Sequence, residues 1–375
     1  MTDSTNCMNE HWGNDPWEID FHPQPRPLPR EVDFAVVGGG FTGSSAAAWL
    51  QRLEPGKKTA LFEAECLGAG SSGRTGGMTL AETAVGDLPG LGDVLAGFSK
   101  IIRELEIDCD HTLPGVWELS RENTLPDSPI CWFDSGKLGV VKEVPGGTAD
   151  PGKLVSGLAR AAERQGAQIF EHAPVDKIFF DDPLELQISG QRIRAQRVLI
   201  ATNAQSLDLS ELEANAHPKF TLAVATEGLT TKQIHALGCD SGKPFYTIDL
   251  PYLWGRLLHK TQMIFGSGLV HLDDWRELKK IDVESGQAAE LLRQLQTRVR
   301  GLHPELKSVK LTNRWGGPIL IGEQAKPVFA HHRKNPAAIV LGAYSGHGVA
   351  LSVYLGRWAA EAMVKKRSLP AWNAT

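Results

Sequence analysis

The sequence predicts an α/β fold, in which a parallel-sheet domain built from discontinuous segments is joined to an antiparallel, β-rich (α+β) domain. Three observations support this prediction. Residues 33–63 read as strand, glycine loop, helix and strand, residues 338–365 repeat the strand, glycine loop and helix, and short turn-bounded apolar runs lie between them. Continuous apolar runs are typical of parallel sheets, whereas short runs bounded by turn residues are typical of antiparallel ones.

The first of these units carries a nucleotide-binding pattern. Gly38, Gly40 and Gly43 form a G-x-G-x-x-G motif between the strand and an alanine-rich helix, and the next strand ends in Glu63. Gly38 permits the tight turn, Gly40 lets a pyrophosphate approach the backbone, and Gly43 lets helix and strand pack closely. The helix N-terminus attracts phosphate, and Glu63 is placed to accept hydrogen bonds from a ribose. The alternative is a glycine-rich turn that binds no nucleotide.

A second glycine-rich stretch follows at residues 64–83. Its glycines are too frequent for a helix or strand, so we expect its backbone to lie close to a ligand. The side chains of Ser71, Ser72, Arg74 and Thr75 are donors suited to a phosphate or to a flavin edge. An ordinary flexible loop is the alternative.

The remaining elements follow from apolar spacing and end signals. Helices are expected over residues 93–107, over 150–165 between Asp150-Pro151 and Gly166, within 284–306 up to Gly301, and over 349–365. Alternating prolines near residues 23–29 predict an extended N-terminal arm, which either docks through its tryptophans or remains a loose tail.

These elements give a domain division. We expect an arm at residues 1–31, a cofactor domain from residues 32–83, 150–205 and 314–366, and a substrate domain from residues 84–149 and 206–313.

Composition excludes several classes of protein. The chain has 375 residues, a net charge of −5 and 42% hydrophobic residues, which describes an ordinary globular protein without a basic surface for nucleic acid. It has no apolar run of about 18 residues and no secretory signal, so we expect no transmembrane segment and a cytoplasmic location. Five dispersed cysteines without a C-x-x-C pair argue against a disulfide framework and against a metal site.

Four blocks in order resemble the FAD-dependent oxidoreductases of the D-amino-acid oxidase (DAO) superfamily. They are VVGGGFTGSSAA with Glu63, GAGSSGRTGGM, VLIATNA and GAYSGHGVALSVYLGRWAAE, with RWGGPILIGEQAKPVF as a fifth, weaker block. Together they cover roughly residues 30–366, and they are most similar to the glycine/sarcosine oxidase and gamma-glutamylputrescine oxidase branch. The resemblance implies a Rossmann-like FAD-binding domain and a substrate-binding domain.

The resemblance also implies how FAD lies. The pyrophosphate would lie at residues 38–43, the adenine at the Val175 backbone, and the pyrimidine end of the flavin at residues 345–349. Helix and loop N–H groups there would stabilise the negative charge of reduced flavin, and His347 either adds a donor or faces solvent. The cofactor-binding residues expected are Gly38, Gly40, Phe41, Thr42, Gly43, Glu63, Ala64, Ser71, Ser72, Arg74, Thr75, Gly76, Gly77, Met78, Val175, Ala201, Thr202, Gly346, His347, Gly348 and Val349.

Three departures from the family pattern narrow the function. No arginine follows Trp315-Gly316, where amino-acid oxidases of the superfamily hold the substrate carboxylate, and Arg314 would point to the opposite face of the strand. This favours an amine or a larger amino compound over a simple α-amino acid. No cysteine follows Cys239, so we expect non-covalent FAD. Residues 263–270 lack the lysine that assists oxygen reduction in some oxidases of the branch.

The resemblance implies oxidation of the C–N bond of an amine or amino acid to an imine by hydride transfer to the flavin, with O2 as acceptor and H2O2 as product. One alternative is a dehydrogenase that reduces a quinone or a carrier protein, and another is a non-catalytic FAD-binding assembly protein. Aromatic side chains suit an ammonium group, and Arg256 either binds a distal carboxylate or forms a structural salt bridge. The candidates for the catalytic pocket are Tyr252, Arg256, Trp315, Tyr344 and His347, with Tyr246 and Trp254 beside them.

Overall fold

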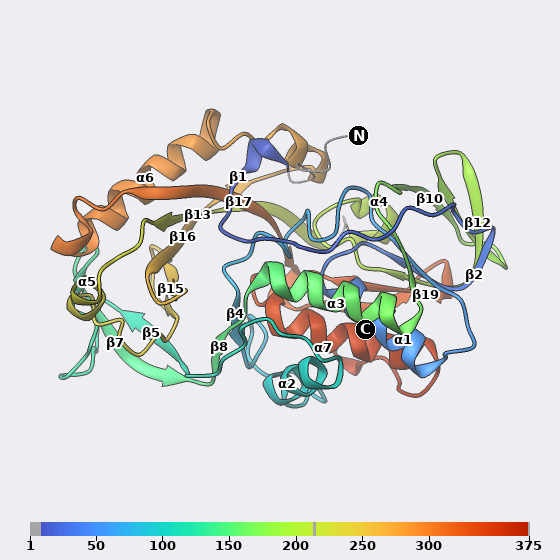
Figure 1. The fold of residues 1–375 in the computed structure, drawn as a ribbon, viewed down its shortest axis with the longest axis horizontal. Coiled ribbons are helices and arrows are strands. Elements are labelled where there is room, and N and C mark those ends of the chain that lie inside the picture. The colour runs from blue at the N-terminus through green and yellow to red at the C-terminus, as the bar shows by residue number, and fades with distance from the viewer. Residues whose placement is uncertain (1–8, 213–214, 374–375) are drawn as a thin grey trace.

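The computed structural model describes residues 9–212 and 215–373, which form two large sheets and a layer of helices. One sheet has nine strands in the order β1-β17-β13-β16-β15-β14-β5-β7-β6, and the other has eight. In Figure 1 the strands of the first sheet lie in the left half and those of the second in the right half. The predicted α/β class is confirmed.

The eight-stranded sheet has a parallel centre. Strands β19, β12, β2, β3 and β9 are hydrogen-bonded in that order and run parallel, while β10, β11 and β18 add antiparallel edges. Consequently the carboxyl ends of the parallel strands meet at one edge, which is where open α/β sheets bind ligands. The strands span Glu31–Val37 (β2), Thr59–Phe62 (β3), Gln168–Phe170 (β9), Val175–Phe179 (β10), Leu184–Ile188 (β11), Gln191–Ile200 (β12), Val328–His332 (β18) and Asn335–Gly342 (β19).

The nine-stranded sheet is largely antiparallel. Its longest pairing joins β13 to β17, and β16 lies on the other side of β13. Its strands span Gly13–Asn14 (β1), Val116–Ser120 (β5), Trp132–Phe133 (β6), Lys137–Val144 (β7), Phe245–Thr247 (β14), Trp254–Leu258 (β15), Gln262–His271 (β16), Ala216–Thr226 (β13) and Leu311–Gly322 (β17). A separate ribbon pairs Met78–Leu80 (β4) with Gly146–Thr148 (β8).

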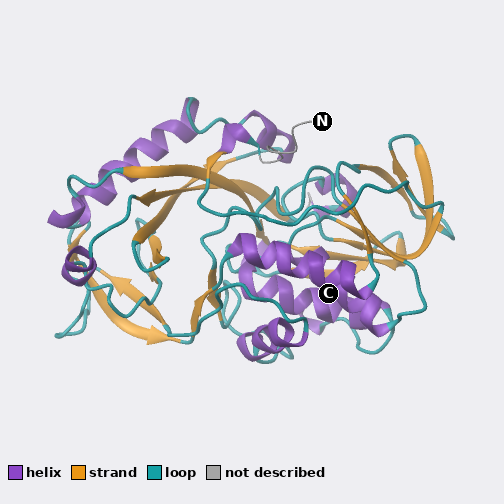
Figure 2. Ribbon diagram, in the orientation of Figure 1, coloured by secondary structure: helices purple, strands orange, loops and turns teal. Residues whose placement is uncertain are grey.

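The helices gather against the parallel sheet. Figure 2 shows α1, α3, α7 and α2 side by side in the lower centre, while α6 runs along the other sheet and the short α5 lies at its far left. Asp150 caps α3 by accepting a hydrogen bond from the Lys153 N–H at 2.9 Å, and Gly166 ends the helix at a φ of 106°, both as the sequence predicts. The helices span Phe41–Leu53 (α1), Val94–Glu104 (α2), Pro151–Gln165 (α3), Leu207–Ser210 (α4), Thr231–Ala236 (α5), Gly286–Leu302 (α6) and Gly348–Met363 (α7).

Two segments lie elsewhere than the domain prediction puts them. Strand β17 was expected in the cofactor domain from residue 314 onward, but it pairs along β13 in the nine-stranded sheet. Helix α2 was expected in the substrate domain, but its apolar face packs with α1, α3 and α7. Gly301 does not end α6, because the helix continues through Gly301 to Leu302.

The described part of the arm docks on the body. Strand β1 pairs with Trp315 and Arg314 of β17, and the buried Trp12 donates its indole N–H to the Leu278 carbonyl at 3.1 Å. The ring of Trp12 packs edge-on against Phe220, with centroids 5.4 Å apart. Of the two alternatives for the arm, the docked one therefore holds for residues 9–31.

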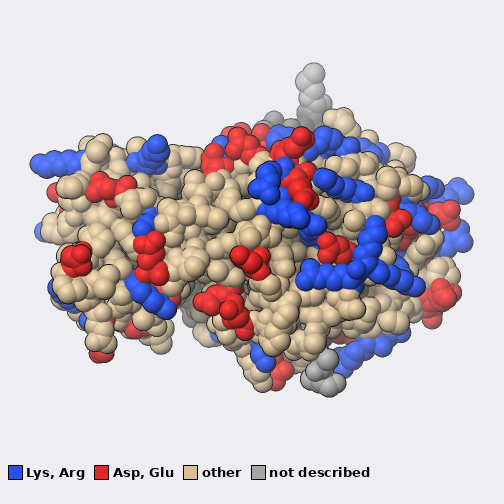
Figure 3. All heavy atoms as spheres, turned by 90° about the horizontal axis from the view of Figure 1, so that it is seen from below, with Lys and Arg blue, Asp and Glu red and all other residues tan. Residues whose placement is uncertain are grey.

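Three further expectations concern the whole chain. Within residues 9–212 and 215–373, no helix combines the length and the apolar character needed to cross a membrane. Acidic and basic side chains are interspersed over the face drawn in Figure 3. Cys109, Cys131 and Cys239 are free, but Cys66 is disulfide-bonded, a bridge that the dispersed cysteines did not predict.

Candidate functional site

A cavity of about 1010 Å³ lies between the two sheets. The ends of β2, β3 and β12 and the N-termini of α1 and α7 line one part, and the strands β13, β16 and β17 line the other. The cavity brings together nearly all of the predicted site residues, although their roles stay predictions. Those that line it are Gly38, Gly40, Phe41, Thr42, Glu63, Ala64, Ser71, Ser72, Arg74, Thr75, Gly76, Met78, Val175, Ala201, Thr202, Tyr252, Trp315, Tyr344, Gly346, His347, Gly348 and Val349.

The glycine motif forms the turn at the end of β2. Gly38 has a φ of 105°, and a Cβ there would lie 2.7 Å from the Ala201 carbonyl oxygen on the neighbouring strand end. Gly43 does not line the cavity, because it faces the strand, where a Cβ would overlap the Gly38 carbonyl oxygen. The first glycine therefore makes the turn and the last allows close packing of helix on strand.

Both helices that point at the cavity begin without a side-chain cap. Helix α1 starts after Gly40 and α7 after His347, and neither residue makes a capping hydrogen bond through its side chain. One N–H of the first turn of α1, that of Phe41, donates to the Ser72 hydroxyl at 3.0 Å. Uncapped helix N-termini carry partial positive charge and free donors, so the part of the cavity beside these two helix starts suits a negatively charged group.

Glu63 closes the nucleotide end. Its carboxylate accepts hydrogen bonds from the N–H groups of Gly39 at 2.7 Å and Glu65 at 3.0 Å. Burial raises the pKa of the Glu63 carboxyl above its ordinary value, although these two N–H donors oppose the rise. The carboxylate therefore keeps acceptor capacity beside the cavity for hydroxyl donors such as those of a ribose.

Arg74 was expected to bind the cofactor and lies on the cavity wall, but most of its donors bind other parts of the chain. Its guanidinium donates to the carbonyls of Asn9 at 3.1 Å, Trp12 at 3.3 Å and Gly13 at 3.2 Å, and lies 3.7 Å from Asp15. The Nη1 and Nη2 donors therefore hold the N-terminal arm, while Nε is buried without a partner within the described chain, so the predicted contact with a phosphate stays a prediction. Burial lowers the pKa of Arg74, and the nearby Asp15 opposes that shift.

Arg256 corrects an expectation of the sequence analysis. It does not line the cavity, and its guanidinium donates to the backbone carbonyls of Ala149 at 2.8 Å, Gly76 at 3.1 Å and Gly77 at 3.3 Å. It therefore contributes neither a carboxylate site nor the predicted salt bridge, but fixes the glycine-rich loop. Gly77 lies outside the cavity wall for the same reason. Tyr246 also lies away from the cavity, since its hydroxyl donates to Glu118 at 2.7 Å.

Tyr344 and His347 shape the end of the cavity beside α7. The Tyr344 hydroxyl lies 2.6 Å from the Thr42 hydroxyl, which links the C-terminal loop to the glycine motif. The His347 Nδ1 lies 3.4 Å from the Ser345 carbonyl oxygen, and burial lowers the pKa of the imidazole. His347 is therefore a neutral side chain at neutral pH, so it does not add a formal positive charge to the site.

Several cavity residues were missed by the sequence analysis. Asn203 joins two glycine loops, because it accepts from the Ala343 N–H at 3.0 Å and donates to the Ser71 hydroxyl at 3.3 Å. Its place in VLIATNA was the available signal. Leu250 and Leu269 come from the β-rich segment, and nothing local in the sequence marks them.

The cavity wall also holds buried hydroxyls without a partner. Thr202 Oγ1 and Ser352 Oγ are buried, make no hydrogen bond within the described chain, and belong to lining residues. A buried polar group without a partner is costly, so these atoms fit a polar ligand that completes their hydrogen bonds. With the uncapped helices, they match a phosphate-bearing cofactor.

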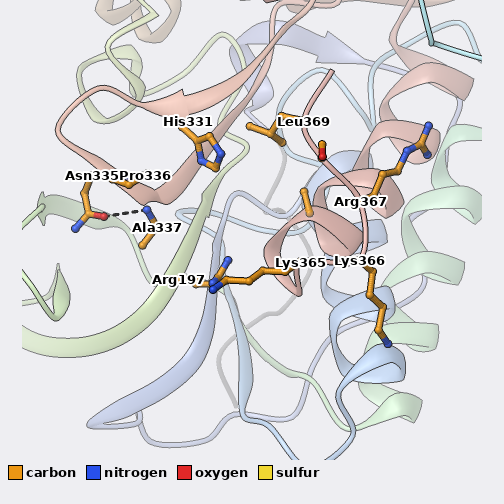
Figure 4. A pocket seen from close by; sticks show the side chains of 11 residues that line it. Arg197, His331, Asn335, Pro336, Ala337, Lys365, Lys366, Arg367 and Leu369 are labelled. Atoms are coloured by element: carbon orange, nitrogen blue, oxygen red, sulfur yellow. Dashed lines mark hydrogen bonds between the residues drawn. The ribbon is translucent and has the colours of Figure 1, made fainter. Parts of the chain in front are cut away.

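A smaller pocket of about 640 Å³ lies at the other end of α7 (Figure 4). Basic side chains, among them Arg197, Lys365 and Lys366, surround it, and no predicted site residue does. Lysines there follow the last turn of α7, where positive charge complements the helix dipole. The pocket is therefore explained without a ligand.

A parallel α/β sheet, uncapped helix N-termini and unpartnered hydroxyls around one long cavity define a dinucleotide-binding protein. The chain belongs to the DAO family of FAD dependent oxidoreductases, whose model matches residues 33–362. It is therefore an FAD-dependent oxidoreductase, as the resemblance of its motifs implied.

Individual proteins are also similar to this chain. Gamma-glutamylputrescine oxidoreductase of Escherichia coli (strain K12) is 28% identical, with 88% of this chain and 83% of that protein covered. Glycine oxidase of Bacillus licheniformis is 23% identical, with 92% of this chain and 96% of that protein covered. The structures of glycine oxidase from Geobacillus kaustophilus (covering 92% and 98%) and L-proline dehydrogenase from P. horikoshii (92% and 96%) each have a TM-score of 0.71 at 18% identity. At that identity they show a shared fold.

Proposed function

We propose that the enzyme oxidises the C–N bond of a primary or secondary amine to an imine and passes the electrons to O2. The observation that carries this proposal is the continuity of the cavity from two uncapped helix N-termini to an aromatic and aliphatic end. The similarity to proteins named glycine oxidase and gamma-glutamylputrescine oxidoreductase supports an amino compound as substrate.

The wall of the substrate end supports an amine over a simple α-amino acid. Among the described residues that line the cavity, Arg74 is the one arginine and no lysine is present. The Nη1 and Nη2 donors of Arg74 bind carbonyls of the arm, which disfavours a two-point pairing of this guanidinium with a substrate carboxylate. Tyr252, Trp254 and Trp315 provide aromatic surface, and such rings attract ammonium groups and pack on alkyl chains.

The residues of the chain position and shield the reactants. The helix N-termini and the Gly38–Gly40 turn would hold the charged parts of the cofactor, and Glu63 would accept hydrogen bonds from its ribose. The Thr42–Tyr344 contact joins the two glycine loops, so the chain that would hold the cofactor is ordered before the reactants bind. FAD supplies the acceptor for a hydride.

The electron balance is simple. The substrate loses a hydride from carbon and a proton from nitrogen, and water then hydrolyses the imine to a carbonyl compound. O2 takes up two electrons and two protons and leaves as H2O2. No general base is required if the amine binds in its neutral form.

Non-covalent FAD and a cytoplasmic location stay predictions from the sequence.

A dehydrogenase is the second candidate function. Strand β16 carries no lysine, and one structure of the same fold is named a dehydrogenase. The fold therefore permits either acceptor.

A non-catalytic assembly protein is the third candidate, and the aromatic surface in the cavity argues against it.

The test is spectroscopic. The purified protein is expected to show a flavin spectrum, and acid precipitation should release FAD into the supernatant if the cofactor is non-covalent. Amines and amino acids are then mixed with it without oxygen, and bleaching near the flavin maximum identifies a substrate. Reoxidation in air with formation of H2O2 supports the oxidase. Slow reoxidation that a quinone accelerates would favour the dehydrogenase, and flavin that no amine reduces would overturn the proposal.

A further inference from the structure

An apolar segment lies at the mouth of the cavity between β14 and β15. Leu250, Pro251 and Tyr252 line the cavity, together with Leu269 from β16. Leu250 is 83% exposed, Tyr252 45% and Leu269 40%. Single exposed apolar residues are common on protein surfaces, but this set is contiguous with one cavity. Its side chains are therefore available to a ligand.

Arg298 of α6 holds the backbone of that segment. Its Nη2 donates to the Pro251 carbonyl at 2.7 Å, and its Nη1 donates to the Tyr252 carbonyl at 2.8 Å. Nη1 also donates to the Ser267 hydroxyl at 2.9 Å. One planar guanidinium thus fixes two successive carbonyls and the neighbouring strand, which a single-point donor such as lysine cannot do.

Asp134 orients this guanidinium. Its two carboxylate oxygens accept from Arg298 Nε at 2.9 Å and Nη2 at 2.6 Å, and the Asp134 side chain is only 4% exposed. Arg121 also pairs with Asp134, and it donates to Asp249 at 2.6 Å. Two cations and two anions therefore balance at the base of the segment.

This network fixes geometry more than it stabilises the fold. Removing charges from water costs about as much as their attraction returns, so a buried ion pair is weak evidence for stability. The contacts that the network makes with residues 249–252 go to the Pro251 and Tyr252 carbonyls and to the Asp249 carboxylate. The apolar side chains are left facing the cavity.

We propose that Arg298 and Asp134 are positioning residues that hold residues 249–252 as a specificity-determining wall, against which the substrate places an alkyl or aryl group. The proposal rests on the proposed function for the nature of the reaction. The proposal adds that the amine carries an apolar group, whereas the proposed function concerns only its ammonium group.

The test compares an aryl amine with a small one. Arg298→Ala is expected to raise the KM for benzylamine about tenfold, the effect of losing charge-assisted hydrogen bonds that order the wall. The KM for methylamine and both kcat values should change less than about twofold, because the reacting atoms lie elsewhere. Arg298→Lys should recover only part of the affinity for benzylamine.

A matched control lies on the same helix. Arg293 is exposed and pairs with Glu290 at 2.6 Å on α6 itself, so Arg293→Ala should retain wild-type kinetics with both amines. If Arg298→Ala raised the KM for benzylamine and the KM for methylamine by the same factor, or changed only the thermal stability, the network would be merely structural and the inference would be overturned.

A binding measurement separates this inference from the proposed function. Benzyl alcohol has the aryl group but no amine, and its dissociation constant follows from perturbation of the flavin spectrum. It should bind about tenfold more weakly to Arg298→Ala than to wild type even if no amine is oxidised. Leu250→Ser tests the wall directly without disturbing a buried network, and unchanged binding of benzyl alcohol in both variants would refute the wall.

Discussion

At the scale of single residues, side chains at several glycines around the cavity would collide with the loops that form its wall. Gly40 shows this most directly. A Cβ there would lie 2.7 Å from the Ser72 hydroxyl, the group that binds the Phe41 N–H at the start of α1. Any side chain at Gly40 therefore disturbs both the helix start and the loop opposite it.

Gly40→Val is expected to abolish flavin binding, because the branched side chain displaces Ser72 and fills the approach to the helix N-terminus. Flavin absorbance per protein after desalting measures the effect. Gly56→Ala is the control, since a Cβ there meets nothing within 4 Å, and it should retain flavin like the wild type. Flavin retained in Gly40→Val would show that the pyrophosphate lies elsewhere.

Residue types alone do not reveal which ligand an arginine serves. Arg74 was predicted to bind ligand, and Arg256 either to bind a carboxylate or to form a structural salt bridge; both donate to backbone carbonyls. The carbonyls come from distant segments, at residues 9–13 for Arg74 and at Ala149 for Arg256. A guanidinium can donate to carbonyl, phosphate and carboxylate oxygens, so only the folded chain shows which of them it binds.

At the scale of elements, local signals predicted the ends of helices and strands well. Helix α3 begins after Asp150 and ends before Gly166 as expected, because capping depends on neighbours in sequence. Strand β17 was expected to return to the cofactor domain, but it pairs with β13, which lies about a hundred residues earlier in the chain. The docking of the arm likewise depends on residues far from it.

Arg74 connects the arm to the cavity wall, and its substitution tests the role of that connection. Arg74→Ala should lower the stability by about 2–4 kcal/mol, because several buried carbonyls lose a charged donor. Thermal unfolding and limited proteolysis near residues 9–31 measure this. Arg26→Ala, which removes a half-exposed ion pair with Glu163 in the same arm, should cost no more than about 1 kcal/mol. If Arg74→Ala lost flavin without losing stability, Arg74 would bind the phosphate of the cofactor, as the sequence predicted.

At the scale of the whole molecule, the cavity forms because two sheets meet. Residue Tyr344 makes a bridge with Ile321 of β17, and the Ser345 hydroxyl accepts from the Gly322 N–H at 3.1 Å. The C-terminal loop therefore contacts both the glycine motif and the nine-stranded sheet. The sequence motifs brought forward the residues of β2, α1 and α7 that line one part of this cavity, whereas the other part is built from strands whose spatial order no local pattern specifies.

Burying histidines in this structure makes its stability depend on pH. Burial lowers the pKa of His111, His332 and His347 below the ordinary value. As pH falls below about 6.5, the unfolded chain takes up protons at these sites and the folded chain does not. The stability that these groups contribute is fully present above that pH and is lost as the pH falls toward their lowered pKa values. The melting temperature should therefore fall between pH 7 and pH 5.

His111 allows this to be tested at one site. Its ring packs edge-on against Phe98, with centroids 4.9 Å apart, and its Nε2 is buried without a partner. His111→Phe keeps an aromatic ring in place and removes the titrating group, so the fall in melting temperature from pH 8 to pH 5 should be smaller than in the wild type. At pH 8 the two proteins differ only by the change of ring, which serves as the internal control. An identical pH dependence in both would show that His111 takes up its proton as readily in the folded chain as in the unfolded one.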